Sequence, residues 1–367
     1  MKKLISILLF ALILTNPFQA EALGISAKSA VVIDAETMRI LYAKNAKEIM
    51  TMASTTKIMT GLLAAEYGNG DALVTVSQNA AYQEGSSMYL KVGEKVKMSE
   101  LLYGLMLSSG NDAAVAIAEQ ISQSTEKFAE KMTERARAIG AYQTSFKNPN
   151  GLDEEGHYTT AYDLALIMAH AMKNELFAKT VATRQITLER GTYTNHNKLL
   201  GSCEGVIGGK TGFTKKSGRC LVTVCEREGF RVIAVTLNAP DDWNDHKNML
   251  DYIYENYKCV NPFSAGAVIC EITAENGEKT GAVCKTDLKY YLNAEEQKRV
   301  EIINDLPPTL KLPVKNGQRV GKVAMMLDGV ILCESPLLAN RDILLPPDES
   351  FYDFFVKAAK IFAKAFR

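Results

Sequence analysis

The most informative stretch of this sequence lies in its first third and reads STTKIMTGLLAA, residues 54–65. A serine and a lysine three positions apart open the stretch, and an apolar run follows them. Side chains three residues apart lie on one face of a helix, so Ser54 and Lys57 are expected within hydrogen-bonding reach. The run from Thr55 to Tyr67 is apolar enough to predict a helix in the centre of a domain.

Ser54 and Lys57 also suit nucleophilic catalysis. A lysine in a dry site loses its charged form, and the neutral amine can then accept the serine proton. The same spacing recurs at Ser124 and Lys127, as chance alone predicts about once or twice in such a chain. That second pair opens a charged helix, where a helix-capping serine explains it. Ser54 is therefore the predicted nucleophile.

Two further polar motifs complete the set. Ser109-Gly110-Asn111 follows the apolar run 101–107, where the hydroxyl can relay protons and the amide can orient the lysine and a substrate. Lys210-Thr211-Gly212 precedes a predicted β-hairpin and places a cation and a hydroxyl beside a strand edge, where glycine lets a substrate backbone approach closely. The similar triplets Ser77-Gln78-Asn79 and Lys279-Thr280-Gly281 are assigned to a surface turn and to a strand start.

The order of strands and helices predicts an α+β catalytic domain over residues 23–259. A hairpin is expected from Ala30 to Asn45, and a second one from the runs 218–225 and 230–237. Helical patterns lie between them: Thr55–Tyr67, Ser99–Gln120, Glu126–Ile139 and Ala161–Met172. Strands at both ends with helices between suggest one antiparallel sheet packed with helices.

Two smaller parts follow. Residues 260–346 contain short strand-like runs with Asn-Gly and Asp-Gly turns, which predicts a small β-rich domain. After Pro346-Pro347, residues 347–367 predict an amphipathic helix with aromatic residues on one face and cations on the other. This helix is expected to lie on an anionic membrane surface. Docking on the β-rich domain is the alternative.

The first 22 residues indicate export. Two lysines, an apolar run at 4–14 and the small-residue site Ala20-Glu21-Ala22 have the order of a secretory signal peptide. The run is too short to span a bilayer as a stable helix. The mature chain is expected to begin near Leu23 and to reside at the outer face of the cytoplasmic membrane. An uncleaved anchor is the alternative.

Composition excludes several classes of function. The 42 basic and 42 acidic side chains cancel, and no basic stripe precedes the extreme C-terminus, so nucleic-acid binding is not expected. The seven cysteines are scattered without a C-x-x-C pair, so no metal site is expected. The four histidines do not suggest a competing catalytic triad. His157 alone lies in a loop expected near the site.

The three motifs, in this order, are the set found in class A β-lactamases and penicillin-binding proteins. The chain resembles the low-molecular-mass D-alanyl-D-alanine carboxypeptidases, serine peptidase family S11. The resemblance rests on segments spread over nearly the whole mature chain: 52–60, 108–114, 148–152, 157–161, 208–214, 313–317 and 327–329.

The resemblance implies roles for the motif residues. Ser54 would form the acyl-ester, Lys57 would accept its proton and Ser109 would relay protons. The substrate-binding residues would be Asn111, Lys210, Thr211, Gly212 and Phe213. Of these, Lys210 and Thr211 would hold the terminal carboxylate, and the Phe213 N–H would complete an oxyanion hole with that of Ser54. The reaction would remove the last D-alanine from peptidoglycan stem pentapeptides without a cofactor, and β-lactams would inhibit it.

Two alternatives remain at this stage. The first is a serine β-lactamase. Those of class A need a Glu-x-x-x-Asn loop that activates water, and residues 148–160 carry Asp153, Glu154 and Glu155 without that pattern. A non-catalytic penicillin-binding wall protein could keep the fold and lose turnover, because fold alone does not establish function. The complete set of motif residues argues against this second alternative.

Overall fold

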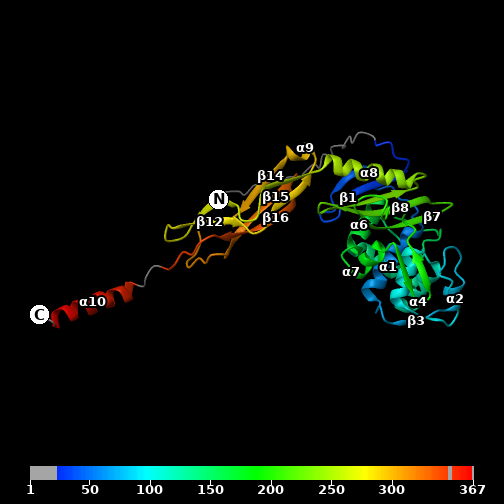
Figure 1. Ribbon diagram of the computed structural model, residues 1–367, viewed down its shortest axis with the longest axis horizontal. Helices are drawn as coiled ribbons and strands as arrows, with labels where there is room; N and C mark the ends of the chain where they lie inside the picture. The colour runs from blue at the N-terminus through cyan, green and yellow to red at the C-terminus, as the bar shows by residue number, and fades with distance from the viewer. Residues whose placement is uncertain (1–22, 346–348, 366–367) are drawn as a thin grey trace, which may run out of the picture. The chain divides into compact units, whose positions relative to one another are not determined.

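The computed structural model describes residues 23–345 and 349–365. The chain divides into two compact units between Tyr252 and Ile253, within helix α8 (Asp242–Asn256), which is labelled in Figure 1. This junction lies a few residues before the predicted domain boundary at residue 259. The proposed signal peptide, residues 1–22, lies outside the described residues.

The first unit is built on a five-stranded antiparallel sheet with the order β2-β1-β9-β8-β7. Its strands are β1 (Ser29–Asp34), β2 (Ile40–Lys44), β7 (Val206–Thr214), β8 (Gly218–Arg227) and β9 (Phe230–Leu237). Strand β1 pairs with β9, with Ala30 opposite Thr236, so strands from both ends of the unit share one sheet. This confirms the α+β class predicted from the sequence.

Helix α1 (Lys57–Tyr67) is the centre of the helical layer. It begins directly after a 3-10 turn, η1 (Ala53–Thr56), and packs against the five helices α3 (Met98–Leu107), α4 (Asn111–Ser122), α5 (Thr125–Ile139), α6 (Ala161–Ala171) and α7 (Glu175–Ala182). Figure 1 shows the sheet between α8 on one face and α1 and α6 on the other. Residues 57–64 of α1 are all buried, which agrees with the central helix predicted from its apolar sequence.

The predicted helix Ser99–Gln120 is wrong as a single element. It forms α3 and α4, separated by residues 108–110. Ser109 has φ +60°, a left-handed conformation that a helix interior does not accept. The break places the Ser109-Gly110-Asn111 motif at the start of α4 instead of inside a helix.

Short elements complete the first unit. They are the helix α2 (Gln78–Ala81), the paired strands β3 (Leu73–Thr75) and β4 (Lys95–Lys97), and the paired strands β5 (Gln185–Leu188) and β6 (Gly191–Thr194). A long connection, residues 82–94, joins α2 to β4.

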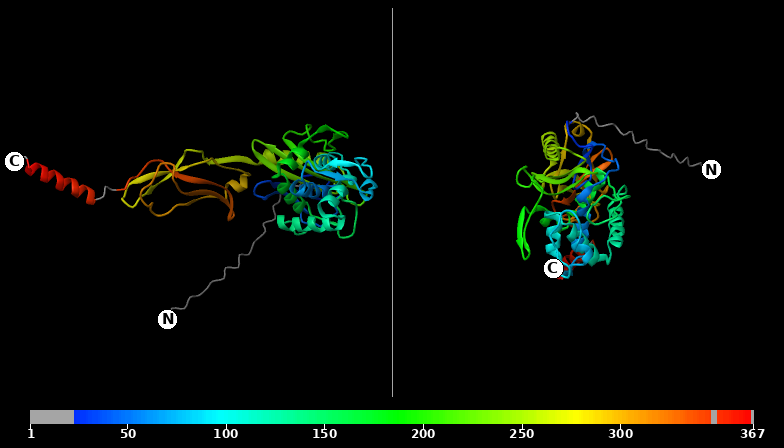
Figure 2. Two further views of the ribbon diagram at one scale, coloured as in Figure 1. Left: turned by 90° about the horizontal axis from the view of Figure 1, so that it is seen from below. Right: turned by 90° about the vertical axis from the view of Figure 1, so that its right-hand side faces the viewer.

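The second unit is β-rich and elongated (Figure 2). Its main sheet has the order β11-β12-β16-β15-β14, with β11 (Val268–Thr273), β12 (Lys279–Cys284), β14 (Val300–Asp305), β15 (Arg319–Leu327) and β16 (Val330–Ala339). Strands β10 (Lys258–Phe263) and β13 (Leu288–Leu292) form a separate pair, and α9 (Ala294–Gln297) follows β13. The Asp328-Gly329 turn joins β15 and β16 with φ +49° and +82°, as that dipeptide predicts.

A last helix, α10 (Glu349–Ala365), follows the β-rich part of the chain. Within residues 23–345 and 349–365, no helix combines the length and the apolar character needed to cross a membrane.

Candidate active site

The buried amine of Lys57 is the centre of the candidate site. Its side chain is fully buried, and its Nζ atom lies 3.0 Å from Ser54 Oγ, 2.7 Å from Asn111 Oδ1 and 2.5 Å from the carbonyl oxygen of Asn150. The η1 turn followed by α1 places Ser54 and Lys57 one helical turn apart, as the three-residue spacing predicts.

The surroundings favour the neutral form of this amine. Burial holds the pKa of Lys57 well below its usual range, and the positive charge of Lys210 lowers that pKa further. The carboxylate of Asp112 acts in the opposite direction and raises the Lys57 pKa. Lys57 can therefore act as a proton acceptor at a pH where an exposed lysine is charged.

A second pair links the other two motifs. Lys210, on β7, is almost fully buried and donates a hydrogen bond to Ser109 Oγ at 3.1 Å. Burial lowers the pKa of Lys210 to about 7. The left-handed conformation of Ser109 turns its hydroxyl out of the helical layer toward β7. Residues that are 101 positions apart in the chain thus meet at the site.

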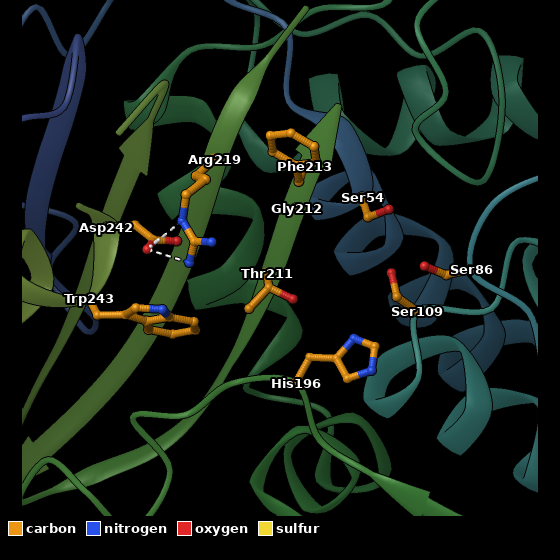
Figure 3. Close-up of a pocket in the computed structure, with 10 residues that line it drawn as sticks. All are labelled: Ser54, Ser86, Ser109, His196, Thr211, Gly212, Phe213, Arg219, Asp242 and Trp243. Carbon is orange, nitrogen blue, oxygen red and sulfur yellow. Dashed lines mark hydrogen bonds and ion pairs between the residues drawn. The ribbon is translucent and has the colours of Figure 1, made fainter. Parts of the chain in front are cut away.

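Ser54 and Ser109 border a cavity of about 310 Å³ (Figure 3). Its walls contain Ser54, Ser86, Ser109, His196, Thr211, Gly212, Phe213, Arg219, Asp242 and Trp243. Figure 3 shows the Ser54, Ser86 and Ser109 hydroxyls on one side and Thr211 on the facing strand β7. The cavity thus brings together Ser54, Ser109 and the predicted Thr211–Phe213 strand.

Gly212 is needed where β7 passes the nucleophile. A Cβ atom at this position would lie 3.0 Å from the main-chain nitrogens of Ser54 and Thr55, and 3.1 Å from the carbonyl oxygen of Met52. The next residue, Phe213, is 65% exposed. The close approach of β7 to η1 brings the main chain around Phe213 beside that of Ser54.

Sequence analysis missed Arg219, on β8. Its Nε and Nη2 atoms donate to Asp242 Oδ1 at 2.9 and 2.7 Å, and its guanidinium lies 5.5 Å from the ring centre of Trp243. The β7–β8 register places Arg219 opposite Phe213. Nothing in the local sequence distinguishes this arginine, because its importance depends on strand pairing and on the distant Asp242.

His157 holds a loop beside the nucleophile. Its Nδ1 accepts a hydrogen bond from the Lys147 N–H at 3.0 Å, so Nε2 carries the proton and donates to Thr56 Oγ1 at 2.8 Å. Burial lowers the pKa of His157 to about 4. This histidine fixes the loop that supplies the Asn150 carbonyl to Lys57, and it does not line the cavity of Figure 3.

The competing motifs do not line this cavity. Ser124 caps α5, as predicted, and accepts a hydrogen bond from the Lys127 N–H at 3.2 Å. The surface turn expected at Ser77 is instead the start of the short helix α2, which Ser77 caps by accepting from the Ala80 N–H. Lys279 begins β12 and pairs with Glu271.

Comparison with known proteins identifies the family of this chain. The family model for D-alanyl-D-alanine carboxypeptidase, peptidase S11, matches residues 16–241. The chain belongs to this family. A second model, for the C-terminal domain of penicillin-binding protein 5, matches residues 257–344. The chain is therefore a serine D-alanyl-D-alanine carboxypeptidase, a penicillin-binding protein of peptidoglycan metabolism.

Individual relatives agree over most of the chain. It is 34% identical to the D-alanyl-D-alanine carboxypeptidase DacF of Bacillus subtilis, over 94% of this chain and 95% of the relative. It is 29% identical to DacC of Escherichia coli, over 88% of this chain and 86% of that protein. Penicillin-binding protein 5 of Haemophilus influenzae is similar in structure, with a TM-score of 0.68 at 28% identity, covering 88% of this chain and 98% of that one.

The lowered pKa of Lys57 predicts how acylation of this carboxypeptidase depends on pH. Only the neutral amine accepts a proton, so the rate of labelling by a fluorescent penicillin should fall as the pH falls through the Lys57 pKa. That step should lie well below about 10.4, the value for a free lysine. Stopped-flow fluorescence over a pH series measures it.

Lys210 provides the control for this prediction. In Lys210→Met the like charge is gone, so the Lys57 pKa should rise and the step should move to higher pH, although the overall rate also falls. A rate that does not fall from alkaline to acidic pH in the unaltered enzyme would contradict the assignment of a titrating base.

Proposed function

We propose that this enzyme removes the terminal D-alanine from peptidoglycan stem pentapeptides through an acyl-enzyme on Ser54, with Lys57 as the general base. The observation that carries the proposal is the 3.0 Å contact between Ser54 Oγ and an amine whose burial favours the neutral form. A neutral amine at hydrogen-bond distance from a serine hydroxyl is the arrangement that nucleophilic catalysis requires.

The proposed reaction has two steps. In the first, Lys57 takes the Ser54 proton, Oγ attacks the carbonyl carbon of the penultimate residue, and the amide bond breaks. The departing D-alanine amine receives this proton from Lys57 through Ser109, whose hydroxyl also accepts a hydrogen bond from Lys210. In the second step, water attacks the ester and regenerates the Ser54 hydroxyl. The Ser54 and Phe213 N–H groups would stabilise the oxyanion in both steps.

The substrate carboxylate would lie on the β7 side of the cavity. Lys210 and Thr211 were expected there from the family resemblance, and Arg219 adds a guanidinium to the same wall. Asp242 accepts hydrogen bonds from Nε and Nη2 of Arg219. Among the residues that the structure describes, none accepts a hydrogen bond from Nη1, so this atom is available to a ligand. A guanidinium held in this way can bind a carboxylate with little further ordering of its side chain.

The first test concerns the nucleophile. Ser54→Ala should reduce D-alanine release from a model pentapeptide by about 10⁴-fold or more and abolish covalent labelling by penicillin. Ser124→Ala is the matched control, because Ser124 occupies the same Ser-x-x-Lys spacing and only caps a helix. Covalent labelling that persists in Ser54→Ala would refute the nucleophile assignment.

The second test concerns Arg219. Arg219→Met should raise KM for a peptide ending in D-Ala-D-Ala by about 10-fold or more, because a hydrogen bond to a charged group contributes about 1.5–3 kcal/mol. The same peptide with a C-terminal amide should show no additional loss. Arg231→Met, on the neighbouring strand β9, is the control, since Arg231 pairs with Glu226 instead. Equal losses for acid and amide would exclude a carboxylate contact.

We further propose that the protein is exported and that α10 holds it on the outer face of the cytoplasmic membrane. Residues 1–22, whose sequence suggests a signal peptide, lie outside the described residues. In α10 the side chains of Phe354, Phe355, Ile361 and Phe362 are between 58% and 69% exposed. Lys357 and Lys360 are exposed as well and lie on the other side of the helix by sequence position. Such a helix suits the interface of an anionic bilayer.

Truncation tests the membrane proposal. Deleting residues 350–367 should release the protein from anionic liposomes in a sedimentation assay and leave peptide hydrolysis in solution unchanged. The double variant Phe354→Ser/Phe362→Ser keeps the charges and should also lose binding. Unchanged sedimentation of the truncated form would place the anchor elsewhere. A lower melting temperature with unchanged sedimentation would instead support docking on the β-rich unit.

A further inference from the structure

One wall of the catalytic cavity comes from the long connection between α2 and β4. Within it, residues 84–90, called here the 84–90 segment, contain Ser86, which lines the cavity opposite β7 (Figure 3). The segment is not part of a helix or strand. Gly85 and Tyr89 have φ angles of +88° and +59°. A non-helical stretch with a left-handed tyrosine keeps one conformation only if its surroundings impose it.

Asp112 binds the N–H groups of this segment. Its side chain is fully buried at the start of α4, directly after Asn111. One carboxylate oxygen accepts hydrogen bonds from Ser87 Oγ at 2.6 Å, from the Met88 N–H at 2.9 Å and from the Leu90 N–H at 3.1 Å. Hydrogen bonds to an ionised carboxylate are short and strong, so Asp112 and its three donor groups fix one another's positions.

Arg190 binds the carbonyl groups of the same segment. It lies in the turn between β5 and β6, and its Nη1 and Nη2 atoms donate to the carbonyl oxygens of Met88 and Tyr89, both at 3.1 Å. Glu94 fixes the guanidinium through bonds of 2.6 and 3.2 Å. Asp112 thus binds N–H groups of the 84–90 segment, and Arg190 binds carbonyl groups of the same segment.

The 84–90 segment, held by Asp112 and Arg190, in turn orients Asn111. The Asn111 N–H donates to the Ser86 carbonyl at 2.7 Å, and Asn111 Nδ2 donates to the Glu84 carbonyl at 2.6 Å. With Nδ2 bound to Glu84, the oxygen Oδ1 of the same amide faces Lys57 Nζ at 2.7 Å. Without the Glu84 carbonyl, the amide would lose the contact that fixes which of its ends meets the lysine.

We propose that Asp112 and Arg190 are positioning residues for acylation: they clamp the 84–90 segment so that the Glu84 carbonyl fixes the Asn111 amide against Lys57. This inference rests on the proposed role of Lys57 as the base. Loss of the clamp should slow proton transfer from Ser54 more than it weakens substrate binding. It should therefore reduce kcat more than it raises KM.

Asp112 has a second effect that a purely structural residue would lack. Its negative charge raises the Lys57 pKa, whereas Lys210 lowers it. Removing the Asp112 charge should lower the Lys57 pKa further, so the fall in acylation rate on acidification should move to lower pH. Arg190 is not among the charges that shift the Lys57 pKa, so its loss should slow acylation without moving that step.

The experiment compares Asp112→Asn, Arg190→Met and Ser87→Ala in the full chain. The measurements are the second-order rate of acylation by fluorescent penicillin across a pH series, and kcat and KM on a D-Ala-D-Ala peptide. Asp112→Asn and Arg190→Met should each slow acylation on the order of 10-fold to 100-fold, with a smaller effect in Ser87→Ala. Only Asp112→Asn should shift the pH step. Asp71→Asn, at an exposed carboxylate of the same unit, should match the unaltered enzyme.

Unaltered acylation rates in Asp112→Asn and Arg190→Met would overturn the proposal. So would slow acylation with an unmoved pH step in Asp112→Asn, because the proposed arrangement places the Asp112 charge where it acts on the Lys57 pKa. If Asp112→Asn does not fold by circular dichroism, Arg190→Met and Ser87→Ala decide: a fall in kcat supports the clamp and unchanged kinetics refute it. Failure of the underlying mechanism is recognised separately, by labelling that persists in Ser54→Ala.

Discussion

Burial of the Lys57 amine is the constraint on which the rest of the site depends. An uncompensated ammonium in a protein interior is strongly unfavourable, so a buried lysine needs acceptors on every side or must give up its proton. Three oxygens lie within hydrogen-bond distance of Lys57 Nζ, from η1, from the start of α4 and from the loop containing Asn150. In the neutral amine the two N–H groups are donated to Asn111 Oδ1 and the Asn150 carbonyl, and the lone pair faces Ser54 Oγ. Each of these segments has to be placed within about an ångström for the set to form.

The helical layer supplies that placement. Helix α1 is surrounded by other helices, so its first turn cannot move without disturbing the packed core around Ile58, Leu62 and Leu63. The break between α3 and α4 then presents Ser109 and Asn111 to the same point from another direction. The cost of a left-handed serine at this break is met by the contacts that it makes possible, chiefly the bond from Lys210.

The local part of the site follows from sequence because it depends on helix periodicity. Ser54 and Lys57 are three residues apart, and helix spacing alone brings them together. The single sheet formed by both ends of the first unit also follows, since strands separated by helices must pair to satisfy their main-chain groups. The helix break at Ser109 does not follow from propensity, because residues 99–120 are helical in character on both sides of it.

The contributions of Arg219 and Arg190 were beyond sequence analysis for a common physical reason. Each guanidinium is held by an acid that is distant or unremarkable in sequence, Asp242 for Arg219 and Glu94 for Arg190. Because the carboxylate accepts hydrogen bonds from some of the guanidinium N–H groups, the remaining N–H groups keep a fixed direction. Arg219 then faces the cavity, and Arg190 faces the carbonyls that shape its opposite wall. A free arginine would have to lose rotamer entropy at each of these contacts, whereas one already paired has lost most of it on folding. The main contribution of the two ion pairs to the site is therefore orientation. Each one fixes the direction of the guanidinium N–H groups that it does not itself use, and this matters more than the stability that it adds.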